Sequence, residues 1–574
     1  MHYRNFTKVY FYFFLLLSFP SFAQTDKEKE NIAGVLKSAK DNFIMGRYKV
    51  AVDEYLLLLE SDSNNLTYYM RVGVCYLYSN IDKSKSIYYF EKVTANPKGD
   101  VNAWYELGRA YLITYNIDKA ITCFEKYKQI TNGKEGFEIS SDRMLQMCEE
   151  ARRQIANPVN VTIENIGPEI NSPYADYYPY VPNDESFLVF SSKRAGNTGS
   201  FLDYDGNNTA DVYISYQKYD KWSKAKGVGN TINSTLVEET AGLSSDGTKL
   251  FVYSDNFNAM GQILLSTKKL KAFQKPEFLG TNISSSKFVS SGAISPNKKI
   301  LIFSCDKNEA AGGMDLFMSR KLPSGKWGVP ENLGAVVNTI YDEEFPYFAS
   351  DGKTLYFSSQ GHNSMGGYDI FKTIYDENSN TWSEPVNIGY PINTTDNDFT
   401  ISLSATGRHG YISSPRPGGY GDIDIYKVIF NDVDPAYTIL SGEIVNTDSI
   451  CIFKVPEIKE INGNILAVNV HDNNTIDLNG SEIIKPDSIV IYKDVKVDIT
   501  VTNINTMKKF GKYLPNKTTG KYLFVLPPGD YKLEVNADGY SKYSEVIKVF
   551  DRSLNCEIFK DIVLLPLTEE ENKN

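Results

Sequence analysis

The chain has 574 residues, which is too long for one hydrophobic core and predicts about three or four domains. It carries 60 Lys and Arg against 71 Asp and Glu, and this net charge of -11 argues against a nucleic-acid binder, which needs a concentrated basic face. Forty Tyr and 31 Phe favour half-buried pleated surfaces, so we expect a chain rich in sheet.

Residues 1–23 have the order of a secretory signal peptide. Arg4 and Lys8 precede an almost wholly apolar run over residues 9–19, and small residues lead to a cleavage site after Ala23. The run is too short to span a bilayer, no Cys follows the cleavage site, and no later stretch is long and apolar enough to cross. We therefore expect an exported mature chain that does not span the membrane and has no lipid anchor. A buried N-terminal helix is the alternative.

Residues 30–156 repeat small and aromatic residues at a helical period. Ala39, Gly73 and Gly108 occupy equivalent small positions, 34 and 35 residues apart. The other shared positions are Tyr76 and Tyr111, then Ala51, Ser84 and Ala120, and then Tyr55, Tyr88 and Phe124. This pattern resembles the tetratricopeptide (TPR) repeat.

The resemblance implies an all-α stack of antiparallel helix pairs, closed by a capping helix over about 141–156. Small residues let paired helices approach closely, and the aromatic rings fill the space beside them. Such a stack leaves a concave face that often holds a peptide or another protein. Alternatively, the helices only brace the next domain.

Residues 159–430 repeat two landmarks at a longer period of 50 to 63 residues. The first is a turn with glycines at Gly167, Gly229, Gly280, Gly334 and Gly389. The second is a short apolar strand that ends at Ser191, Ser254, Ser304, Ser358 and Ser413. Two independent landmarks with nearly the same spacing indicate a true structural repeat.

Each of these units carries four strand signals, which is the make-up of a propeller blade. A strand led by Asp follows the serine strand in four units, and the last strand carries an aromatic residue. The residues are Asp211, Asp315, Asp369 and Asp424, and then Trp222, Phe273, Trp327 and Trp382. We predict a five-bladed β-propeller in which strand 159–166 completes the last blade and closes the ring. Six blades are the alternative, and the repeat resembles the WD-type repeat of TolB-like propellers.

Residues that could carry chemistry do not gather in the predicted propeller. His362 and His409 hold different positions in their units, and no nucleophile-elbow pattern occurs. The recurrent Asp residues follow the repeat, which is typical of an architectural role. We therefore predict no catalytic and no cofactor-binding residue.

One loop interrupts the repeat and resembles the first part of a calcium loop. Asp203, Asp205, Asn207 and Asp211 supply oxygen side chains at suitable spacing. The closing Glu is missing, because Ile214 stands in its place. A hairpin tip without metal explains the same residues, so this is a weak metal candidate.

Residues 436–565 alternate as half-buried strands do, and turn signals separate the runs. The sequence TGKYLFVLPPGDYKLEV, followed by ADGY, resembles the carboxypeptidase-regulatory-like β-sandwich, a transthyretin-like fold. The polar insert at about 447–487 is expected to be a flexible excursion, and 566–574 is a polar tail. Six Cys are scattered along the chain, and Cys451 with Cys556 is the likeliest disulfide.

The order of these modules resembles exported OmpA-family envelope proteins, among them the PorE group of the type IX secretion machinery, which is also associated with gliding. That family typically continues into an OmpA-like domain that grips peptidoglycan. We expect no such domain within these 574 residues, so the resemblance does not imply direct anchoring to the cell wall. The resemblance implies a periplasmic protein associated with the outer membrane, held by other envelope proteins such as a barrel of the PorP/SprF kind.

The leading functional hypothesis is a non-enzymatic scaffold or adaptor that docks envelope proteins. A second hypothesis is a glycan or peptidoglycan binder that uses tyrosine-rich loops, such as 174–180 and 418–420, as stacking platforms. A third is a propeller hydrolase. No cofactor is expected.

Overall fold

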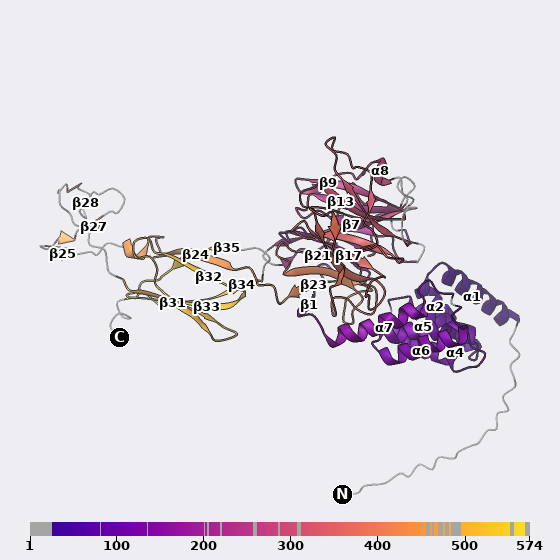
Figure 1. Cartoon of the computed structure of the whole chain (residues 1–574). Coiled ribbons are helices and arrows are strands. Elements are labelled where there is room, and N and C mark those ends of the chain that lie inside the picture. Colours follow the sequence, from indigo (N-terminus) through magenta and orange to yellow (C-terminus); the bar gives the residue numbers. More distant parts are fainter. Residues whose placement is uncertain are drawn as a thin grey trace, which may run out of the picture. The chain divides into compact units, whose positions relative to one another are not determined.

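The computed structural model describes residues 26–568, except 81, 135, 200, 204–205, 219–220, 256–260, 285–287, 307–311 and 552–555; within 455–494 it describes short strands alone. The predicted signal peptide therefore lies outside the described residues. The chain forms two compact units (Figure 1). One contains the residues up to Asp142 with Leu202–Asn207, and the other contains Arg143–Phe201 and Asn208–Asn574.

The first unit is helical, and consecutive helices pack against each other. Its elements are α1 (Asp26–Ile44), α2 (Tyr48–Ser61), α3 (Leu66–Leu77), η1 (Lys83–Lys85), α4 (Ser86–Thr94), α5 (Asn102–Ile113) and α6 (Ile117–Thr131). The Asn65 side chain fixes the start of α3, because its Oδ1 accepts from the backbone N–H groups of Thr67 at 3.1 Å and Tyr68 at 3.3 Å.

The recurrent spacing of small residues has a packing cause. A Cβ on Gly73 would lie 2.6 Å from the Phe90 ring, and a Cβ on Gly108 would lie 2.7 Å from the Phe124 ring. Each glycine therefore lets one helix rest directly on an aromatic ring of the next. Ala39 is fully buried at the corresponding position of α1.

The second helical repeat, formed by α3, η1 and α4, differs from its expected alignment. Ser84 and Tyr88 are exposed, whereas Ser86 and Phe90 are fully buried at the equivalent positions. The reason is η1, a short 3-10 turn over Lys83–Lys85 that delays the start of α4. The assignment of Ser84 and Tyr88 to the packed face is therefore wrong by two residues.

The second unit begins with α7 (Ser141–Ala156) and continues into antiparallel sheets with a propeller-like fold (Figure 1). Among the described residues, five such sheets follow the five repeat units. The first holds β2 (Asp176–Tyr180), β3 (Phe187–Ser192), β4 (Asp211–Lys218), β5 (Lys221–Trp222) and β6 (Lys226–Gly227). The second holds β7 (Val237–Leu243), β8 (Lys249–Asp255), β9 (Gln262–Lys269), β10 (Ala272–Phe273) and β11 (Glu277–Phe278), and α8 (Thr281–Ser284) follows it.

The third sheet holds β12 (Val289–Ile294), β13 (Ile300–Cys305), β14 (Asp315–Arg320) and β15 (Glu331–Asn332). The fourth holds β16 (Glu343–Phe348), β17 (Thr354–Ser359), β18 (Asp369–Asp376), β19 (Thr381–Trp382) and β20 (Val386–Asn387). The fifth holds β21 (Ser402–Leu403), β22 (His409–Ser414), β23 (Asp424–Phe430) and β1 (Val161–Asn165). In it, β1 runs antiparallel to β23, with Val161 opposite Phe430 and Asn165 opposite Tyr426.

One backbone hydrogen bond recurs between neighbouring sheets. An N–H at the start of the first strand of a sheet, or a few residues before it, donates to the carbonyl just before the third strand of the preceding sheet. The pairs are Glu238 to Ala210 (3.0 Å), Val289 to Gly261 (2.8 Å), Glu343 to Met314 (2.7 Å), Asp398 to Tyr368 (2.7 Å) and Asp176 to Ile423 (2.8 Å). The last pair leads from the fifth sheet back to the first.

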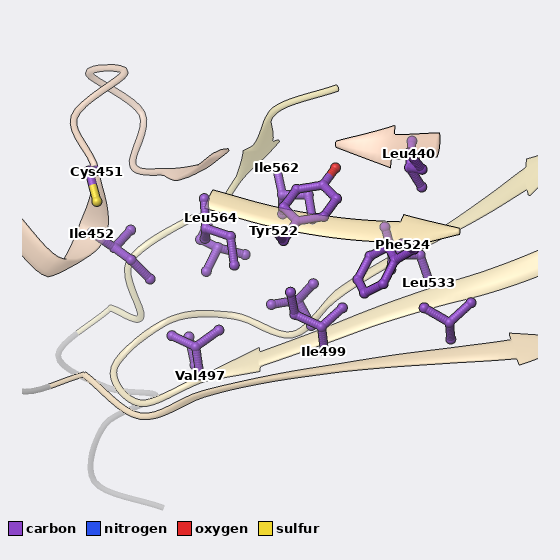
Figure 2. Packing of buried hydrophobic residues seen from close by; sticks show 14 of the residues in the cluster. Leu440, Cys451, Ile452, Val497, Ile499, Tyr522, Phe524, Leu533, Ile562 and Leu564 are labelled. Atoms are coloured by element: carbon purple, nitrogen blue, oxygen red, sulfur yellow. The ribbon is translucent and has the colours of Figure 1, made fainter. Parts of the chain in front are cut away.

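Two further sheets share one apolar core near the C-terminus (Figure 2). One sheet contains β24 (Thr438–Val445), β32 (Lys521–Leu526), β35 (Cys556–Phe559) and β36 (Ile562–Val563). The other contains β30 (Val497–Asn503), β31 (Lys509–Tyr513), β33 (Gly529–Ala537) and β34 (Tyr543–Val549). Their buried faces meet through residues such as Leu440, Phe524, Ile499 and Leu533. We call these two sheets the tail sheets.

The described parts of the insert before β30 are short. They are η2 (Ile452–Lys454), β25 (Glu460–Ile461), β26 (Asn464–Ile465), β27 (Ala467–Val468), β28 (Thr475–Ile476) and β29 (Glu482–Ile483). Cys451 packs into the core of the tail sheets with a free thiol, so the expected Cys451–Cys556 disulfide is not formed. Among the helices of the described residues, none combines the length and apolar content that crossing a membrane requires.

Candidate functional site

The recurrent Asp residues accept hydrogen bonds that hold turns of the sheets in place. In the fourth sheet, Asn387 Nδ2 donates to Asp369 Oδ2 at 2.6 Å, while Asn387 Oδ1 accepts from the N–H of Gly389 at 2.9 Å. Gly389 has a φ of 92°, which favours glycine. Asn393 closes the turn, because its Nδ2 donates to Asn387 Oδ1 at 2.7 Å. Asp369 therefore anchors the glycine turn.

The same arrangement recurs in other sheets. The Asn–Asp bonds are Asn165 to Asp424 at 2.7 Å and Asn332 to Asp315 at 2.7 Å. The remaining glycines of the turns, Gly167, Gly229, Gly280 and Gly334, also have positive φ values of 85° to 106°. The motif in which Asn precedes the glycine by two residues is visible in the sequence, yet its partner Asp lies too far away for local spacing to identify it.

His362 belongs to the same framework. Its Nε2 lies 2.9 Å from the carbonyl oxygen of Val337. In the first and fifth sheets, Arg194 and Arg416 donate to the equivalent carbonyls, those of Ile170 at 2.7 Å and Ile392 at 3.0 Å. Burial lowers the pKa of His362. The histidine therefore replaces a structural arginine of the repeat.

The calcium candidate is used by the fold in other ways. Asp211 Oδ2 accepts from the backbone N–H and the hydroxyl of Thr198, both at 2.9 Å. Asp203 donates its backbone N–H to the carbonyl of Asn207 at 2.7 Å, which forms a turn. Asp205 lies outside the described residues. Within the part of the chain that the structure describes, no group of three or more His, Cys, Asp or Glu could hold a metal ion.

A cavity of about 650 Å³ lies in the helical unit. Its wall comes from α1, the start of α2, α3 and α5, and from the segments before α5 and after α6. The residues that line it include Phe43, Tyr48, Met70, Arg71, Tyr78, Lys98, Asp100, Asn102 and Glu106. We call this cavity the helical groove.

Aromatic rings of the helical groove lie beside two cations, Arg71 in its wall and Arg109 next to it. The rings of Phe43 and Tyr48 lie 5.5 Å apart, and those of Tyr48 and Tyr78 lie 5.8 Å apart. The Arg71 guanidinium stands 4.2 Å from the centroid of Phe43, and that of Arg109 stands 4.8 Å from Tyr78. The wall therefore combines flat apolar faces with positive charge.

The acidic side chains of the helical groove have partners within the unit. Glu106 is buried, and burial raises its pKa, although Arg109 and the Tyr78 hydroxyl, at 3.2 Å, favour the charged form. Burial likewise raises the pKa of Tyr78 to about 12. Asp100 Oδ1 accepts from the backbone N–H of Asn102 at 3.0 Å.

The basic side chains that line the helical groove are Arg71 and Lys98. Within the part of the chain that the structure describes, neither Arg71 nor Lys98 makes an ion pair with a carboxylate. The helical groove therefore offers an incoming ligand two cations that no carboxylate of the described residues pairs with, beside the Asp100 carboxylate. Sequence reasoning missed these residues because neither is among the shared positions of the helical repeat.

Comparisons with known proteins identify no family for this chain. No family model and no curated protein matches it. Among solved structures, hydrazine synthase of Kuenenia stuttgartiensis is similar at 12% identity and a TM-score of 0.27, over 43% of this chain and 76% of that chain. An α-L-arabinofuranosidase of Lactobacillus brevis matches at 12% identity and a TM-score of 0.27, over 50% of this chain and 95% of that chain. The WD40 repeats of RRP9 match at 7% identity and a TM-score of 0.25, over 47% of this chain and 98% of that chain. At these scores nothing about activity or ligands follows.

Proposed function

We propose that this chain is a non-enzymatic scaffold or adaptor of the bacterial envelope, exported to the periplasm and associated with the outer membrane. In this proposal the helical unit is a stack of TPR repeats, the five sheets are a closed five-bladed propeller, and the tail sheets are a transthyretin-like sandwich. The partner is another envelope protein, such as a barrel of the PorP/SprF kind or a component of type IX secretion or gliding machinery.

The helical groove carries this proposal. It joins exposed aromatic surface to Arg71 and Lys98, whose charges no carboxylate of the described residues neutralises. A partner segment that brings apolar and acidic side chains would bury the rings and neutralise both cations. By contrast, the Asp residues of the repeat and His362 are occupied by structural hydrogen bonds, which supports a role without catalysis.

Charge reversal in the helical groove tests this function. The double variant Arg71→Glu, Lys98→Glu and the wild type are used to capture partners from solubilised outer membranes. Lys126→Glu, an exposed reversal on α6, is the matched control. The proposal expects an envelope protein that binds the wild type and the control at least tenfold better than the double variant. A partner set that is identical for all three proteins would contradict it.

A glycan-binding role is the second candidate, and it rests on two exposed tyrosines. Tyr174 and Tyr420 are exposed, and Gly421 packs directly on the carbonyl of Tyr174. Tyr177 and Tyr180 are buried, so the 174–180 segment offers less stacking surface than its sequence suggests. Binding of muropeptides that Tyr174→Ala and Tyr420→Ala both abolish would favour this candidate; equal binding by all variants would exclude these residues.

A further inference from the structure

His409 is buried between two carboxylates from distant parts of the chain. Its side chain is 1% exposed at the start of β22. Nδ1 lies 3.0 Å from Glu185 Oε1, in the turn between β2 and β3. Nε2 lies 3.4 Å from Asp551 Oδ1, just after β34 of the tail sheets, which is ion-pair distance without hydrogen-bond geometry. One imidazole therefore joins the first sheet, the fifth sheet and the tail sheets.

Each carboxylate has a second partner. Arg408 clasps Asp551, with Nε at 2.9 Å and Nη2 at 2.6 Å. The Tyr411 hydroxyl donates to Glu185 Oε1 at 2.7 Å. Asp551 is a quarter exposed, whereas the side chain of Glu185 is 5% exposed. Two further charges act on this cluster: Lys427 opposes the charge of His409, and Asp434 favours the charge of Arg408.

The protonation state of His409 decides how many of these contacts can form. An imidazolium has two N–H donors, so it can face both carboxylates favourably. A neutral imidazole has one donor and presents a lone pair to the other carboxylate, which is unfavourable in a buried site. Burial opposes the charge, but Asp551 and Glu185 outweigh it, and the pKa of His409 is raised.

We propose that His409 is a proton-operated latch, which as imidazolium fastens the Asp551 end of the tail sheets to the junction of the first and fifth sheets. When it loses its proton, Asp551 is left to Arg408, and the tail sheets loosen. Because the folded-state pKa is raised, the contribution of the latch is complete below the ordinary histidine value of about 6.5 and is lost as pH rises through the raised value. A protein exposed to the external medium could in this way couple pH to the freedom of its C-terminal sheets.

Limited proteolysis of the full chain tests the latch. We measure the rate at which a protease cleaves within 431–437, the segment between β23 and β24, at pH 6 and at pH 9. Each rate is divided by the cleavage rate of a free peptide of the same sequence at the same pH. We expect the wild type to be cleaved faster at pH 9 than at pH 6, because His409 loses its proton as pH rises through its raised pKa. In His409→Gln the rate should be high at both values. His362→Gln, at the other histidine of these sheets, should keep the pH response of the wild type.

Asp551→Asn provides the second arm, because its position is partly exposed and the substitution preserves the side-chain shape. It should abolish most of the pH response even if His409→Gln does not fold. A wild-type rate that does not change with pH would overturn the latch. So would an undiminished pH response in Asp551→Asn.

Discussion

The backbone N–H of Asp176 donates to the carbonyl of Ile423 at 2.8 Å. This bond joins the first sheet of the propeller-like fold to the last, and it repeats the contact that every other neighbouring pair of sheets makes. The junction between the two ends of the repeat is therefore built from the same geometry as its interior.

Gly421 tests how tightly this junction is packed. A Cβ at this position would lie 2.2 Å from the carbonyl oxygen of Tyr174 and 2.3 Å from that of Ser172, and neither backbone atom can move aside freely. We expect Gly421→Ala to lower the free energy of unfolding by about 2 kcal/mol in urea titrations. The control is Gly227→Ala, where the new Cβ meets only the Asn233 side chain at 3.5 Å. Equal stability of both variants would show that the junction is loose.

Asn393 tests the network behind the glycine turn. It is fully buried, and it both accepts from the N–H and donates to the carbonyl of Ile370, each at 2.8 Å. Asn393→Ala leaves the buried N–H of Ile370 without its partner, whereas the Ile370 carbonyl still accepts from the N–H of Ile388 at 3.1 Å. We expect the substitution to cost about 2 kcal/mol of unfolding free energy. Asn378→Ala, in an exposed turn of the same sheet, should change stability by less than about 0.5 kcal/mol. Equal free energies of unfolding for the two variants would show that the hydrogen bonds of Asn393 contribute little to stability.

Arg143 attaches α7 to the fourth sheet. Its guanidinium donates to the carbonyls of Gln360 and Gly361 at 2.8 Å and of His362 at 3.0 Å. Arg143→Met should destabilise this unit by about 3 kcal/mol, because buried carbonyls lose a charged donor. Arg152, on the same helix, pairs with Glu149 at the surface, so Arg152→Met should cost less than about 1 kcal/mol. Thermal unfolding of both variants checks the difference, and similar losses would contradict the assigned role of Arg143.

Glu343 predicts a pH dependence of stability. Burial raises its pKa to about 7, although Ser359 and Thr339 donate hydrogen bonds that oppose this shift. Since the folded-state pKa is raised for an acid, the folded chain binds more protons than the unfolded chain between about pH 4.5 and 7, and stability falls across that interval. Unfolding free energies measured over this range should fall for the wild type and fall less steeply for Glu343→Gln. Parallel slopes would disprove the assignment.

Periodicity made the propeller-like fold predictable, because each unit repeats the same turn chemistry; the positive φ of Gly334 and its equivalents is one instance. The helical repeat was predictable for the same reason at Gly108, but η1 displaced the aligned positions of the second unit to Ser86 and Phe90. A short 3-10 turn changes the register without changing the composition, so the sequence carries no clear mark of it.

Side-chain contacts outside the repeats could not be predicted from the sequence. Arg71 has no counterpart in the shared positions of the helical units, and only the folded groove reveals its place beside Phe43. Arg408 and Asp551 lie 143 residues apart, and no local spacing connects them. Contacts of this kind depend on tertiary packing alone.

If the helical groove docks a partner, site-specific photo-crosslinking in cells will capture that partner at the groove. A photoreactive residue replaces Met70 in the helical groove or, as control, Tyr88, which is exposed on α4 and does not line the groove. We predict a crosslink from position 70 to an envelope protein and none to that protein from position 88. Crosslinks of equal yield from both positions, or none from position 70, would contradict the account.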